Sequence, residues 1–236
     1  MDNFALKWEK FVHAMIDNGG YHTVLEGLKN TLMVAVFGLI IGIVIGTLIA
    51  AVEVMPKYKR LPRVLQKVCQ LYVAFFRGTP LVVQLLVGYF VLRPMLGLKL
   101  SALASCILIY GMNSGAYVSE IMRSGIQSVD SGQMEAGRAL GLSYVTTMFR
   151  IVIPQAVKNI LPTLGNEFIA LVKDTSVVSF VGTTDLYVAF KFIGTNNYEF
   201  MIPYLVMALI YIAMVLLITL GIHLMERSLK KSDRRH

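Results

Sequence analysis

Polar side chains that could do chemistry interrupt the long apolar stretches of this 236-residue chain. An ionisable side chain inside such a stretch is costly to bury in a membrane, so it usually marks a functional site. Three of these residues, Asn113, Tyr117 and Glu120, follow at spacings of four and three and share one helix face. A water-lined route for a zwitterion needs such charges and hydroxyls, but the same groups could instead stabilise helix contacts. The full set is Arg77, Asn113, Tyr117, Glu120, Glu167, Lys173, Asp174, Thr175, Ser176 and Ser179.

Arg77 has a specific local context. It stands beside Gly78-Thr79-Pro80, and proline there interrupts the hydrogen bonds of a helix. A kink is therefore expected at Pro80, and the freed carbonyls need other donors. Arg77 is expected to pair with an acid such as Glu120 or Glu167, or to line the route itself.

A second polar segment runs from about Ser124 to Arg150. Ser131 can cap a short helix, and Gly141 can end that helix in a left-handed turn. Ser143 can cap a second short helix that leads to Pro154. The segment is therefore predicted to form two short helices joined at a sharp bend, an exposed element suited to docking into a partner protein.

No arrangement of residues indicates catalysis, metal binding or a bound cofactor. Cys69 and Cys106 stand alone, without neighbours at metal-ligand or redox spacing, and the four histidines are scattered. The sequence contains no nucleophile elbow, no metal-ligand cluster and no G-x-x-x-x-G-K-[ST] phosphate loop. We therefore expect a chain that is not an enzyme and that binds neither metal nor nucleotide itself.

Helices that cross a membrane must position these residues. The chain is 56% hydrophobic and only 15% charged, whereas a soluble domain carries roughly a quarter charged residues. The net charge of +8 does not indicate nucleic-acid binding, because the basic residues lie between apolar runs. Five stretches approach the roughly 20 residues that a helical span requires. They are about Thr31–Val54, Val68–Leu92, Leu98–Ile121, Ile153–Val172 and Met201–Leu224.

Lysine and arginine placement sets the expected orientation, because these residues concentrate on the cytoplasmic side. They gather after the first and third spans and at the C-terminus. These groups are Lys57, Lys59, Arg60, Arg63 and Lys67; Arg123, Arg138 and Arg150; and Arg227, Lys230, Lys231, Arg234 and Arg235. We predict an all-α membrane protein with an external N-terminus. Its parts are an external amphipathic segment (1–30), a transmembrane domain (31–224) with a cytoplasmic loop (124–152), and a basic cytoplasmic tail (225–236).

Two glycine stripes predict close helix contacts. Gly38, Gly42 and Gly46 repeat every four residues in the first span, and Gly111 and Gly115 repeat the spacing in the third. Small residues at this spacing let another backbone approach closely. Both stripes are expected to face other helices, within the chain or across a dimer.

The cytoplasmic loop resembles a known family. Glu135-Ala-Gly, Gly141 six residues after the glutamate, and Ile153-Pro154 are similar to the EAA loop of ABC importer permeases. Three further segments resemble the polar amino acid permeases within that group. They are Phe76 to Gln84, Ala116 to Ser128, and Leu171 to Ser179. The sequence departs from the pattern with Gly137 in place of the usual second alanine, Asp130 where proline is common, and Ser119 where alanine is frequent.

The resemblance implies a type I ABC importer permease core in a bacterial cytoplasmic membrane. Two permeases, identical or different, would sit on two ATPase subunits that bind ATP and Mg²⁺, and an external binding protein would deliver a polar amino acid. The loop would couple the spans to the ATPase. The residues implied in coupling are Glu135, Ala136, Gly137, Arg138, Leu140 and Gly141.

A stand-alone secondary transporter or channel for a small polar solute is the alternative reading. Such carriers usually have more spans, often as inverted repeats, and no repeat is visible in this sequence. The amino acid carried and the identity of the second permease stay open at this stage.

Overall fold

The computed structural model describes residues 2–55 and 60–233, which form helices and no strand. The N-terminal half comprises α1 (Asp2–Ile16), α2 (Gly20–Glu53), α3 (Arg60–Gly78), α4 (Leu81–Leu86), the π-helical η1 (Val87–Leu92), α5 (Arg93–Met95) and α6 (Ala102–Gln127). The C-terminal half comprises α7 (Ser131–Ala139), α8 (Tyr144–Thr147), the π-helical η2 (Met148–Val152), α9 (Ile153–Asp174), the 3-10 helix η3 (Thr175–Val181), α10 (Leu186–Asn197) and α11 (Met201–Asp233).

Helices fill all five predicted spans, which confirms an all-α membrane protein. Among the described residues, α2 and α11 are each long and apolar enough to cross a membrane. Two pairs of helices joined at a bend are also long and apolar enough if each pair counts as one span. They are Leu61–Gly78 with Leu81–Met95, and Tyr144–Val181 with Leu186–Asn197. The central helix α6 has 26 residues, about 39 Å at 1.5 Å per residue. It has many polar and small residues because it packs inside the molecule.

Several boundaries differ from the sequence prediction. The expected kink at Pro80 is a break of 108° between Leu61–Gly78 and Leu81–Met95. Between the predicted fourth and fifth spans, residues 175–197 form η3 and α10, whose buried residues such as Val178 and Phe190 pack inward. The first long helix begins at Gly20, inside the predicted N-terminal segment, and α11 continues to Asp233 within the predicted tail.

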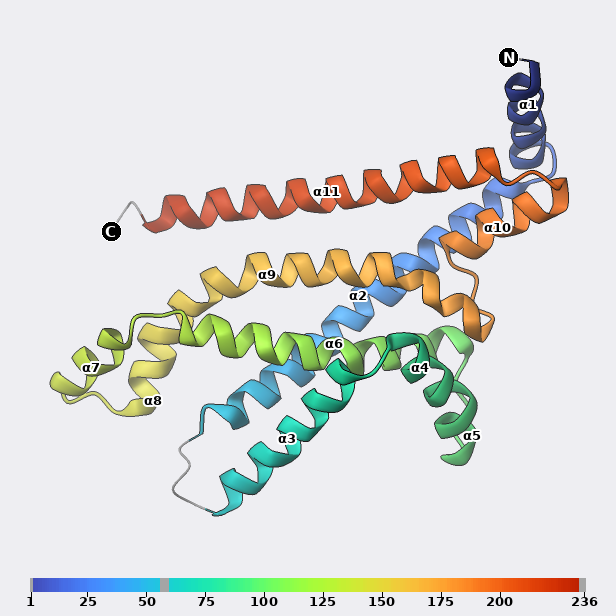
Figure 1. Cartoon of the computed structure of the whole chain (residues 1–236). Coiled ribbons are helices and arrows are strands. Elements are labelled where there is room, and N and C mark those ends of the chain that lie inside the picture. Colours follow the sequence, from blue (N-terminus) through green and yellow to red (C-terminus); the bar gives the residue numbers. More distant parts are fainter. Residues whose placement is uncertain (1, 56–59, 234–236) are drawn as a thin grey trace.

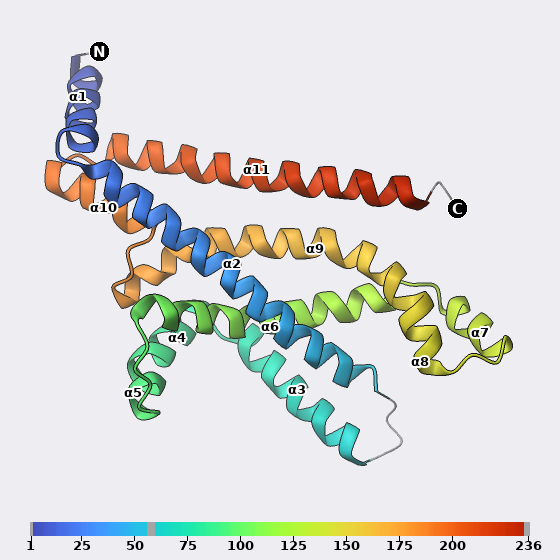
Figure 2. The ribbon, with the colours of Figure 1, turned by 180° about the vertical axis from the view of Figure 1, so that it is seen from behind.

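The two glycine stripes face each other across the contact between α2 and α6. A Cβ on Gly46 would lie 2.7 Å from the Ser119 backbone nitrogen, and one on Gly42 would lie 2.6 Å from Ser114 Oγ. A Cβ on Gly111 would in turn meet Ile41 at 2.5 Å. The predicted close contact is confirmed, and it lies within one chain. Figures 1 and 2 show α6 running through the middle of the molecule, where it packs on both α2 and α9.

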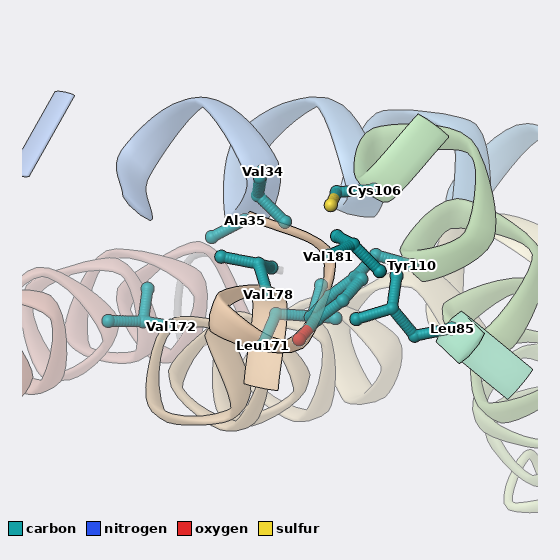
Figure 3. Packing of buried hydrophobic residues seen from close by; sticks show 9 residues of the cluster. All are labelled: Val34, Ala35, Leu85, Cys106, Tyr110, Leu171, Val172, Val178 and Val181. Carbon is teal, nitrogen blue, oxygen red and sulfur yellow. The ribbon is translucent and has the colours of Figure 1, made fainter. Parts of the chain in front are cut away.

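The main core lies where α2, α4, α6, α9 and η3 converge. Tyr110 is fully buried at its centre, and its hydroxyl donates to the Asp174 carbonyl over 2.6 Å. Figure 3 shows how these side chains from distant segments meet. The core residues are Val34, Ala35, Leu85, Cys106, Tyr110, Leu171, Val172, Val178 and Val181.

α1 packs against α10 and α11 through Phe11 and Ala14. Its Lys7 pairs with Glu199 at 3.2 Å. Burial raises the pKa of Glu199, but hydrogen bonds from the Ile202 N–H, from Lys7 and from the Met201 N–H together lower that pKa below its usual value. The N-terminal helix is thus attached to the helices that follow η3.

We expect Gly46→Ala to destabilise the protein, because its methyl group would press on the backbone of α6, which cannot rotate away. Overpacking of this kind costs about 1–3 kcal/mol. Gly221→Ala is the matched control, since nothing lies within 4 Å of its added Cβ on α11. Thermal unfolding in detergent should give a lower midpoint for Gly46→Ala alone. Equal midpoints for the two variants would show that α2 and α6 do not pack this closely.

Candidate functional site

α7 and α8 form the predicted pair of short helices. The carboxylate of Asp130 caps α7 by accepting from the Gly132 N–H over 2.7 Å, so the prediction that Ser131 is the cap was wrong. Gly141 adopts a φ of +73°, the left-handed conformation that the sequence predicts. The Leu142 N–H donates to the Gly137 carbonyl over 2.9 Å, which completes the helix ending. Ser143 caps α8 as predicted, by accepting from the Thr146 N–H.

Of the six residues predicted to act in coupling, one is buried and five are exposed. Gly137 is buried against Thr147, and a Cβ on Gly137 would lie 2.5 Å from Thr147 Cγ2. Thr147 therefore occupies the space that the side chain of the usual alanine would need. The other five, Glu135, Ala136, Arg138, Leu140 and Gly141, are exposed, with Leu140 78% exposed.

The break after α3 holds a network of side-chain amides. Pro80 has no N–H to bond the Phe76 carbonyl, and Gln84 Nε2 donates to that carbonyl over 2.8 Å instead. The same amide donates to Thr79 Oγ1 over 2.9 Å, and Asn113 Nδ2 donates to Gln84 Oε1 over 2.9 Å. Asn113 thus supports the break from α6. Gln84 was not among the residues predicted from the sequence, although an amide side chain one turn after a proline inside an apolar stretch was a usable signal.

A charged cluster lies beside the break, on α3 and α6. Arg77 Nη1 lies 3.6 Å from Glu120 Oε2, so Arg77 faces the first of the two predicted acids. Its guanidinium also lies over the Tyr117 ring, 5.6 Å from the centroid. Arg123 Nη2 contacts the same Glu120 oxygen at 2.6 Å, and Arg123 Nε lies 3.9 Å from Glu53 Oε2 on α2. We call Arg77, Glu120, Arg123 and Glu53 the break cluster. Arg123 and Glu53 were not among the pathway residues predicted from the sequence.

Glu167 lies on α9, apart from the break cluster. Its Oε1 accepts from Ser114 Oγ over 2.9 Å, which places the carboxyl group against α6 near the glycine contact. Lys173 and Asp174 are exposed at the end of α9, whereas Thr175 is fully buried and its hydroxyl donates to the Val172 carbonyl. The ten predicted pathway residues therefore do not form one site.

The last two candidates line an open cavity of about 700 Å³ between η3 and α10. Ser176 and Ser179 contribute hydroxyls, and Lys191 and Thr195 face them from α10. Phe180 and Phe192 are more than half exposed there. The cavity offers hydroxyls and the ammonium group of Lys191, a residue that was not among those predicted from the sequence.

Comparisons with known proteins agree on one family. Residues 38–231 match the family described as the binding-protein-dependent transport system inner membrane component. A putative glutamine transport system permease protein of Rickettsia bellii is 37% identical over 206 residues, which cover 87% of this chain and 92% of the relative. An arginine transport system permease protein of Bacillus subtilis is also 37% identical, over 89% of this chain and 94% of its own.

Solved structures show the same similarity. A chain in the crystal structure of an amino acid ABC transporter with histidines has a TM-score of 0.82 and 36% identity, covering 91% of this chain and 97% of that one. A chain of an inward-facing methionine ABC transporter has a TM-score of 0.69 at 19% identity, over 89% and 95% of the two chains, and supports the fold alone.

We expect Gly137→Ala to loosen α7 from α8, because the added methyl group would collide with Thr147. A local loss of about 1 kcal/mol would raise the open fraction roughly fivefold. Limited trypsin digestion measures this as faster cleavage after Arg138. The double variant Gly137→Ala/Thr147→Ala should return toward the wild-type rate, since the smaller side chain clears the space. Wild-type cleavage of the single variant would contradict the packing described.

Proposed function

This chain belongs to the family of binding-protein-dependent transport system inner membrane components, and on that premise we propose that it is the permease subunit of an ATP-driven ABC importer for a polar amino acid. The family match over residues 38–231 carries the proposal, because it includes both the helices and the α7–α8 element. Relatives named for glutamine and arginine transport support the substrate class.

We assign ATPase coupling to α7 and the turn after it. The exposed residues Glu135, Arg138 and Leu140 offer a charge of each sign and an apolar side chain to a partner surface. The capped ends of α7 and α8 and the packing of Gly137 on Thr147 make the element stiff, so a push on α7 reaches the rest of the chain. ATP and Mg²⁺ belong to two separate ATPase subunits in this proposal, and this chain acts as a non-catalytic translocation subunit.

The proposed route for the amino acid runs from the cavity between η3 and α10, past Glu167 on α9, toward the break cluster. The cavity with Ser176, Ser179 and Lys191 suits the carboxylate of an arriving zwitterion. Glu167, which lies deeper along α9, suits its ammonium group. The break cluster lies nearer the α7–α8 end and is suited to closing the route, because Arg77–Glu120 joins α3 to α6 and Arg123–Glu53 joins α6 to α2.

The proposed orientation puts α7 and α8 in the cytoplasm of a bacterial cell, with the N-terminus outside. Figure 1 supports it, because α7, α8, the end of α2 and the C-terminal end of α11 lie at one end of the molecule, opposite α1, α5 and α10. Basic residues predicted on the cytoplasmic side gather at that end. Lys57, Lys59, Arg234 and Arg235 lie outside the described residues. A second permease subunit and an external substrate-binding protein complete the proposed importer.

Glu135→Lys tests the coupling assignment, and Gly141→Asp tests it independently. Reversing an exposed charge on α7 should weaken docking to the ATPase without unfolding the spans. Gly141→Asp should distort the turn, because its φ of +73° strains a residue with a side chain. In vesicles with the ATPase and binding protein, both variants should lose at least tenfold in uptake per ATP hydrolysed, the equivalent of about 1.4 kcal/mol.

Glu9→Lys on α1 is the matched control, because it makes the same charge change at the other end of the molecule. It should leave the ratio of uptake to hydrolysis unchanged. Wild-type transport by Glu135→Lys and Gly141→Asp would contradict the coupling assignment. Transport of radiolabelled arginine or glutamine by the chain without any ATPase would instead favour a stand-alone carrier.

A further inference from the structure

The C-terminal end of α2 receives hydrogen bonds from two other elements. A helix leaves its last four carbonyls without helical partners. Tyr144 of α8 donates its hydroxyl to the Val54 carbonyl over 3.2 Å. Gln66 of α3 places its Nε2 at 3.1, 3.3 and 3.0 Å from three neighbouring carbonyls, those of Val52, Glu53 and Met55. The end of α2 is therefore the point at which α3 and α8 are joined.

Tyr144 moves with α7. It is the first residue of α8 and follows the cap Ser143, and α8 is fixed to α7 by the packing of Thr147 on Gly137. The Leu142 N–H also bonds the Gly137 carbonyl across the turn. A displacement of α7 is consequently transmitted to the Tyr144 ring, which is 41% exposed and reaches out to α2.

Gln66 fixes α3 to the same point. Gln66 is only 5% exposed, so its amide is held against the end of α2 rather than turned toward solvent. α3 continues from there to Arg77 and the 108° break at Pro80. A shift of the end of α2 would therefore move α3, the helix that carries Arg77 of the break cluster.

We propose that Tyr144 and Gln66 are positioning residues that transmit movement of α7 across the end of α2 to α3. This rests on the proposed function, in which an ATPase moves α7. The chain itself links α8 through η2 to α9, so the two hydrogen-bonding side chains supply a second route. With that second route, one displacement of α7 moves both α3 and α9. A path between helices opens only when both of these helices move.

Tyr144→Phe tests the relay most cleanly, because it removes one oxygen atom from a partly exposed ring. Gln66→Met removes the other donor at nearly constant volume. The complete importer in vesicles would be given a radiolabelled mixture of the twenty amino acids. Uptake per ATP hydrolysed should fall about threefold to tenfold in each variant, as expected for one lost hydrogen bond. Hydrolysis itself should stay near the wild-type rate, because the relay lies beyond the ATPase contact.

The double variant provides a second criterion. If the two residues act in series, losing both should reduce the ratio no more than the worse single change, whereas independent effects would multiply. Tyr198→Phe is the control, since Tyr198 is 93% exposed at the opposite end of the molecule, and its ratio should not change. Thermal midpoints for each variant separate lost coupling from unfolding.

A wild-type ratio in Tyr144→Phe would overturn the relay, as would multiplied effects in the double variant. These outcomes differ from failure of the proposed function. If Glu135→Lys uncouples transport and Tyr144→Phe does not, α7 still couples but not through the end of α2. If Glu135→Lys has no effect, the coupling role of α7 is wrong and the relay is wrong with it.

Discussion

The close approach of α2 and α6 is the contact on which the other helices depend. Glycine at three successive turns of α2 lets the backbones meet, and the side chains on either side are then brought into fixed positions. Ser114 lies in this contact and reaches Glu167 on α9. Tyr110, one turn earlier, reaches the Asp174 carbonyl. Because these bonds radiate from α6, the position of α9 follows from how closely α2 and α6 pack.

A second constraint is the need to pair every buried backbone group. Water cannot serve carbonyls inside a membrane protein, and an unpaired one costs about 1–3 kcal/mol. Two buried glutamines on neighbouring elements serve such carbonyls, a buried one at the Pro80 break and partly buried ones at the end of α2. Gln84 serves the carbonyls freed at Pro80, and Gln66 serves those at the end of α2. A side-chain amide thus contributes to both helix endings, with Asn113 supporting the first and Tyr144 the second.

The charged groups divide according to what surrounds them. In the break cluster, acidic and basic side chains alternate at ion-pair distance. Each charge therefore offsets part of the desolvation penalty of its neighbour. Lys191 and the nearby hydroxyls instead face an open cavity, where water and an arriving solute compete for them. The α7–α8 element presents its charges outward on a stiff support. The same residue types thus hold helices together, meet a solute or meet a protein, according to their place in the fold.

Residue type and spacing were enough to predict the membrane class, the five helical stretches, the two glycine stripes and the pair of short helices, although Asp130 and not Ser131 caps the first of the pair. Those features depend on local spacing and residue type, as the left-handed turn at Gly141 illustrates. Tertiary structure alone decided that the stripes face each other and that Arg77 pairs with Glu120. It also decided that Asn113 and Gln84 support a break and that the stretch after Lys173 folds inward. Those outcomes depend on residues far apart in the chain, whose distances are set only when α2, α6 and α9 pack.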